Sequence, residues 1–96
     1  MKKLVLNRNQ SLDVLAKRYV WWETIDWSYA HPEIFLANVM NLGNWNDIQK
    51  LRQLISDTIL KIALQKAPAG SFSPRSWDYW HVKFALPISP IPKRDL

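Results

Sequence analysis

Helix-capping signals divide this chain into short segments whose apolar residues fall on one helical face. Ser73 is followed directly by Pro74, and proline is tolerated at the first position of a helix, where its missing N–H would have no partner. His31 and Pro32 repeat this start signal earlier in the chain, and Gly43 marks an end. This punctuation predicts an all-α fold, a compact bundle of about five short helices.

Apolar residues spaced three and four apart set the expected extent of each helix. The first helix is expected from an N-cap at Ser11 to about Trp22, and residues 23–30 are expected to form a connector. Asn44, and then Ser56 or Asp57, are expected to cap the third and fourth helices. The apolar positions, helix by helix, are Leu12, Leu15, Tyr19 and Trp22; Phe35, Leu36, Val39, Met40 and Leu42; Ile48, Leu51, Leu54 and Ile55; Ile59, Leu60, Ala63 and Leu64; and Trp77, Trp80, His81 and Phe84.

The two ends of the chain differ from the helical middle. Residues 1–10 lack a sustained period and are expected to form a basic arm, with pairing as a strand left open. Residues 11–86 form a single helical domain in this interpretation. Three prolines within six residues make 87–96 a proline-rich extended tail, for which polyproline II is the natural conformation.

Few residues of this sequence suit catalysis or cofactor binding. With 2 glycines the chain lacks a phosphate-binding loop, and without cysteine it forms no disulfide or thiolate site. The only histidines, His31 and His81, lie in different segments, so no metal is expected. Asp78 and His81 are spaced for an acid–base pair, but a structural role for His81 in the aromatic cluster is favoured. We expect no catalytic residues and no cofactor, and do not expect an enzyme.

The N-terminal residues do not predict export. The apolar run at residues 4–6 is much shorter than the roughly 7 to 15 residues of a signal peptide. The other apolar runs fall far short of the roughly 20 residues that span a bilayer. We therefore expect a cytoplasmic protein that does not enter a membrane.

The whole chain has a formal net charge of +5, and its basic residues are concentrated at the start. Residues 19–86 contain equal numbers of basic and acidic residues. A helix-turn-helix over 44–66 is disfavoured because Asp57 would stand where base contacts are made. Because the basic residues gather near the N-terminus, one alternative function is a nucleic-acid-binding regulator that uses them. These residues are Lys2, Lys3, Arg8, Lys17 and Arg18.

Six tryptophans are the most unusual part of the composition. Most of them are expected to fill a small core, but Trp21 and Trp22 point about 100° apart on a helix, so one can be exposed. Exposed tryptophan is enriched among the residues that dominate protein interfaces. We therefore expect a protein-binding surface, for a heterologous partner or a second copy, made from Trp21, Trp22, Trp27, Trp80, Ile88 and Ile91.

Three stretches, residues 39–48, 51–54 and 72–80, resemble a family of short uncharacterised bacterial helical proteins. The shared features are a helix that ends at Gly43, a Gly-x-Trp-x-Asp turn, and a late helix that begins Ser-Pro and continues to Trp80. Members are often encoded beside nucleotidyltransferase toxins of the abortive-infection AbiEii type. The resemblance implies an antitoxin-like partner that restrains or positions such an enzyme, and it supplies no catalytic residues.

Overall fold

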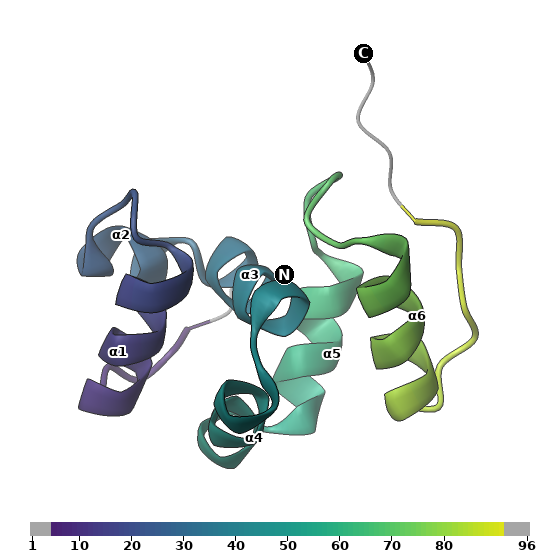
Figure 1. Ribbon diagram of the computed structural model, residues 1–96, viewed down its shortest axis with the longest axis horizontal. Helices are drawn as coiled ribbons and strands as arrows, with labels where there is room; N and C mark the ends of the chain where they lie inside the picture. Colours follow the sequence, from purple (N-terminus) through teal and green to yellow (C-terminus); the bar gives the residue numbers. More distant parts are fainter. Residues whose placement is uncertain (1–4, 92–96) are drawn as a thin grey trace.

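The computed structural model describes residues 5–91, and all regular structure in that part of the chain is helical (Figure 1). The all-α prediction is confirmed, with six helices in the described residues where about five were expected. The helices are α1 (Gln10–Tyr19), α2 (Ile25–Ala30), α3 (Pro32–Leu42), α4 (Trp45–Leu54), α5 (Asp57–Gln65) and α6 (Pro74–Lys83). None of these helices is long and apolar enough to cross a lipid bilayer.

Side-chain caps begin α4, α5 and α6 where the sequence predicted them. The side chain of Asn44 accepts from the Asp47 amide at 2.8 Å. The Ser56 hydroxyl accepts from the amide three residues on at 3.4 Å, and Ser73 caps α6 in the same way at 3.2 Å. Each cap pairs one of the backbone donors that the first turn of a helix leaves free.

The first helix is shorter than predicted and starts earlier. Asn9, rather than Ser11, is its N-cap, with the side-chain oxygen 2.8 Å from the Leu12 amide. The helix ends at Tyr19 and not near Trp22, because the backbone of Val20, with φ −133° and ψ 49°, is not helical. Trp22 is consequently 53% exposed instead of buried in the core.

The expected connector over 23–30 contains a further short helix, α2. Thr24 is its N-cap and accepts from the Trp27 amide at 3.0 Å, while Asp26 lies in the first turn. A hydroxyl residue followed by an acidic residue two positions later is a helix-start signal. The prediction missed this signal because the aromatic residues here do not form a regular apolar stripe.

The ends of α3 and α6 differ in backbone conformation. Gly43 ends α3 with φ −63° and ψ 142°, so it does not adopt the left-handed conformation. A Cβ at this position would lie 2.5 Å from the carbonyl oxygen of Val39, so the close approach of the backbone requires glycine. The last helix ends at Lys83, before Pro87, and Ala85 adopts a positive φ of 54°.

The core is organised around α3, which contacts all five other helices (Figure 1). Phe35, Leu36 and Val39 on α3 have no exposed surface. The other residues predicted for the apolar faces pack around them, except Trp22 in the loop after α1 and Leu42 at the end of α3, which are exposed. Burial of these apolar faces is the main stabilising contribution for such short helices.

Both ends of the described chain pack against the helices in part. Leu6 is buried in the core, and residues 5–9 form no strand. Beyond α6, the carbonyl oxygen of Ser89 accepts from the Trp77 indole at 2.8 Å. Ile91 packs partly against the core, whereas Ile88 is exposed.

Candidate protein-binding groove

A groove of about 230 Å³ lies between α6 and the turn that joins α3 to α4. Its deeper part contains three side chains with little exposure, Met40, Ile48 and Trp80. Trp45 and Tyr79 stand at its rim, 67% and 44% exposed. The complete lining is Met40, Asn41, Gly43, Trp45, Ile48, Ser76, Tyr79 and Trp80.

Hydrogen bonds hold α6 against the end of α3 and so fix the floor of the groove. The indole N–H of Trp80 donates to the carbonyl oxygen of Met40 at 2.9 Å. Asn41 contributes twice, because its side chain accepts from the Ser73 amide at 2.9 Å and its carbonyl accepts from the Ser76 hydroxyl at 3.3 Å. The polar atoms at this contact are paired, which makes the two walls a rigid frame.

The rim residues are positioned by the elements that carry them. Trp45 is the first residue of α4 and directly follows the N-cap Asn44. The cap therefore fixes the position of the Trp45 backbone. Tyr79 lies beside the floor residue Trp80, with ring centroids 5.3 Å apart and planes at 89°. Exposed aromatic rings above an apolar hollow provide the contact that a partner's apolar side chain needs.

A partly buried ionic network anchors the start of α4 from the opposite side. Arg18 donates to both carboxylate oxygens of Asp47, at 2.9 and 2.7 Å, and the Tyr19 hydroxyl donates to the same carboxylate. The Tyr19 oxygen also accepts from the Asn44 amide at 3.3 Å. This network ties α1 to the turn that carries Trp45, and it therefore positions the rim of the groove.

Ionisation of Asp47 is favoured by this network. Burial alone would raise the pKa of Asp47, but hydrogen bonds from Tyr19 and Arg18 outweigh burial and hold that pKa below its ordinary value. The hydrogen bond to Asp47 raises the pKa of the Arg18 guanidinium. Burial, and then the hydrogen bond to Asp47, raise the pKa of the Tyr19 hydroxyl. Asp47 and Arg18 therefore stay charged at neutral pH.

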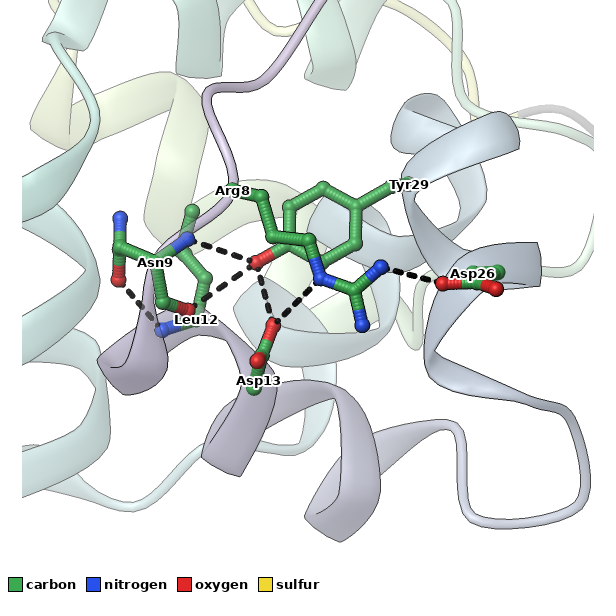
Figure 2. A network of polar contacts seen from close by, with 6 residues as sticks. All are labelled: Arg8, Asn9, Leu12, Asp13, Asp26 and Tyr29. Carbon is green, nitrogen blue, oxygen red and sulfur yellow. Dashed lines mark hydrogen bonds and ion pairs between the residues drawn. The ribbon is translucent and has the colours of Figure 1, made fainter.

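A second network holds the N-terminal segment against α2 (Figure 2). Arg8 donates to Asp26 and lies 3.6 Å from the carboxylate of Asp13. The Tyr29 hydroxyl lies 2.8 Å from Asp13, to which it donates, and it accepts from the Asn9 amide at 3.3 Å. Arg8 also stands over the Tyr29 ring, 5.3 Å from its centroid. The charge of Arg8 is therefore matched by acidic groups of the same chain.

The residues predicted to bind nucleic acid do not form a free basic surface in the described part of the chain. Arg8 and Arg18 are paired with carboxylates, while Lys17 is exposed. Lys2 and Lys3 lie outside the described residues. Phosphate binding by either arginine would have to compete with its ion pairs inside the chain.

The residues predicted to form one partner-binding surface are distributed over several places. Trp21 is 73% exposed and packs edge to face on Trp22, with centroids 5.6 Å apart, in the loop between α1 and α2. Trp27 is half-buried and stacks on His31 at 4.1 Å. The α1–α2 loop and the yellow segment that carries Ile88 and Ile91 lie on opposite sides of the molecule (Figure 1).

Trp80, which was predicted both for the apolar face of the last helix and for the partner-binding surface, is 1% exposed and contributes only to the floor of the groove. It lies on the inner face of α6, where its ring fills the core and its N–H bonds Met40. Sequence reasoning also missed Trp45 and Tyr79. The available signals were a tryptophan directly after an N-cap, and a tyrosine on the same helical face as Asp78 and Lys83.

The described residues contain no cluster of three side chains suited to a metal ion. His81 is buried and its Nδ1 donates to the Trp77 carbonyl at 2.7 Å. Its ring also packs on Trp77, with centroids 4.4 Å apart. This agrees with the favoured structural role, whereas Asp78 is exposed on the outer side of the helix.

All the residues that line the groove come from 39–48 and 72–80, two of the stretches on which the family prediction was based. These stretches are far apart in sequence, and the fold brings them together. Comparison of the chain with protein-family models, curated proteins and solved structures found no match in any of the three.

Proposed function

We propose that this chain is a protein-binding module that contacts its partner through the groove between the α3–α4 turn and α6. The observation that carries the proposal is Trp45, a large apolar ring that is 67% exposed at the rim of an apolar hollow. The core is already filled without it, so its exposure costs the isolated chain apolar surface in contact with water. Tryptophan at the edge of a pocket is a frequent centre of interface energy.

The proposed partner is a nucleotidyltransferase-type toxin, which the chain would restrain or position as an antitoxin does. Support for this partner class comes from the sequence resemblance alone, and the groove is built from the residues that carry the resemblance. The chain would act by occupying a surface of the enzyme. It would supply no reacting group, in keeping with the pairing of His81 and Asp47 inside the fold.

Affinity of the full chain for a purified nucleotidyltransferase-type toxin from the same genome tests the proposal, measured by titration calorimetry after nuclease treatment. Trp45→Ala is expected to weaken binding about thirtyfold, the effect of removing a hot-spot side chain. Trp21→Ala is the matched control, because Trp21 is equally exposed but lies away from the groove.

The outcomes separate the surfaces. Loss of affinity with Trp21→Ala and not with Trp45→Ala would move the contact to the α1–α2 loop. Absence of binding to the toxin, together with a salt-dependent affinity for duplex DNA, would replace the proposal with the nucleic-acid-binding alternative.

A further inference from the structure

The outer face of α6 has the residue pattern of a helix that packs against another helix. Its exposed positions recur at spacings of three and four, on the side opposite the buried Trp77 and Trp80. Tyr79 and Val82 occupy the middle of this face. The exposed positions of α6 are Pro74, Arg75, Asp78, Tyr79, Val82 and Lys83.

The centre of this face is apolar and remains uncovered. Val82 is 69% exposed, and it lines one shallow hollow together with Asp78, Tyr79 and Lys83. A β-branched residue has a lower helix propensity than most alternatives, so an exposed valine does nothing to strengthen α6 itself. Val82 and Tyr79 have the three-residue spacing of the two core positions in a coiled-coil heptad.

Opposite charges flank this apolar centre. Asp78 directly precedes Tyr79 and Lys83 directly follows Val82, so the two charges lie on opposite flanks, five residues apart. In two parallel helices related by a two-fold axis, these flanking positions face each other across the contact. Asp78 would then meet Lys83 of the partner subunit, and the pair would occur twice. An antiparallel pair would instead place each charge beside its own copy, which is repulsive.

We propose that a second copy of this chain docks on the outer face of α6, so that the two α6 helices pack in parallel. Tyr79 and Val82 form the apolar centre, and two Asp78–Lys83 pairs fix the direction. A two-fold contact of this kind requires one self-complementary surface, and the charge pattern of α6 meets that requirement.

The contact is small, and this sets its expected strength. Stable interfaces bury about 800 Å² on each partner, more than one face of a ten-residue helix provides. Arg75 would face its own copy at the start of α6, which confines close contact to the last turns. We therefore expect a weak dimer, with a dissociation constant of about 10 μM to 1 mM.

This inference goes beyond the proposed function and is tested through other residues. Tyr79 lines the groove and also belongs to the outer face of α6, so it is left unchanged. Asp78 and Lys83 do not line the groove. Loss of self-association and loss of toxin binding can therefore be distinguished.

The experiment is sedimentation velocity of the full chain over about 10 μM to 1 mM. Asp78→Lys and Lys83→Asp are each expected to raise the dissociation constant at least about tenfold, because two attractive contacts become repulsive. An equimolar mixture of the two variants, and the double variant D78K/K83D, are expected to return to within about threefold of the unaltered chain. Circular dichroism melts of every variant check that α6 still folds.

Each outcome decides the proposal. Concentration-dependent association that the single charge reversals weaken, and that both the mixture and the double variant restore, supports it. A chain that stays monomeric throughout, single reversals without effect, or failure of either restoration would overturn it.

Discussion

The inner and outer faces of α6 differ sharply in burial and in hydrogen bonding. The inner face carries Trp77, Trp80 and His81, which are buried and hydrogen-bonded to backbone carbonyl groups. The outer face carries exposed residues, with Tyr79 and Val82 among them. The same division recurs in α4, because Trp45 is exposed and Asp47, two residues later, is buried in an ionic network.

Burial, rather than residue type, decides what a tryptophan contributes to the stability of this fold. Trp80 has its ring in the core and its N–H paired, so it stabilises the fold. Trp45 has the same side chain at the surface, where its apolar area stays in contact with water. Substitutions at the two faces should consequently affect different measurements.

Trp80→Ala should have the largest effect on stability. The substitution removes a buried ring and its bond to Met40, and we expect a loss of about 3 to 5 kcal/mol in the free energy of unfolding. Urea unfolding followed by circular dichroism measures the loss. Val82→Ala on the outer face is the matched control and should change stability by less than about 0.5 kcal/mol. Equal effects of the two substitutions would contradict the division of α6 into two faces.

Gly43→Ala should have the next largest effect, because it disturbs the α3–α4 turn, which forms one wall of the groove. The new Cβ would lie 2.5 Å from the Val39 carbonyl oxygen and 3.0 Å from a methyl carbon of Ile48. Relief of these contacts requires a backbone shift, and we expect a loss of about 1 to 3 kcal/mol in thermal or urea unfolding. Asn46→Ala, at an exposed position of α4, should cause no loss, since alanine is the better helix former.

Asp47→Asn should destabilise the fold in a pH-dependent manner. At pH 7 the substitution weakens a charged hydrogen-bond network, and we expect a loss of about 2 kcal/mol. Because folding lowers the pKa of Asp47 below 3.8, the stabilisation is fully present above that value and disappears as pH falls through the folded-state pKa.

The unfolding free energies of the unaltered chain and of Asp47→Asn should therefore stay apart at about pH 6 and converge as the pH falls below about 4. Asp26→Asn is the control, because the side chain of Asp26 is 80% exposed and its ion pair with Arg8 is a surface contact. A constant difference between the unaltered chain and Asp47→Asn across this pH range would show that the ionised carboxylate does not stabilise the fold.

Local signals in the sequence were sufficient for the helix class and for most helix starts, because caps such as Ser73 act within a single turn. They were insufficient wherever the outcome depended on tertiary contacts. The pairing of the Trp80 indole depends on the carbonyl oxygen of Met40, and the need for glycine at position 43 depends on Val39 and Ile48. The groove was missed for the same reason, since its walls come from separate stretches that the fold brings together.

Ser28→Ala should have the smallest effect and the opposite sign. It tests whether every buried residue stabilises the fold. Ser28 is fully buried in α2, yet its hydroxyl oxygen has no hydrogen-bond partner. Alanine removes this unpaired group at the cost of a small volume, so we expect the free energy of unfolding in urea to rise by about 0.5 to 1 kcal/mol.

Ser76→Ala is the control. It deletes a hydroxyl that donates to the Asn41 carbonyl at 3.3 Å, and it should instead lower the free energy of unfolding by about 0.5 to 1.5 kcal/mol. Changes of opposite sign at the two serines would show that pairing of a buried hydroxyl, and not burial alone, determines its contribution to stability. A loss of stability with Ser28→Ala as large as that with Ser76→Ala would mean that the Ser28 hydroxyl is paired in solution.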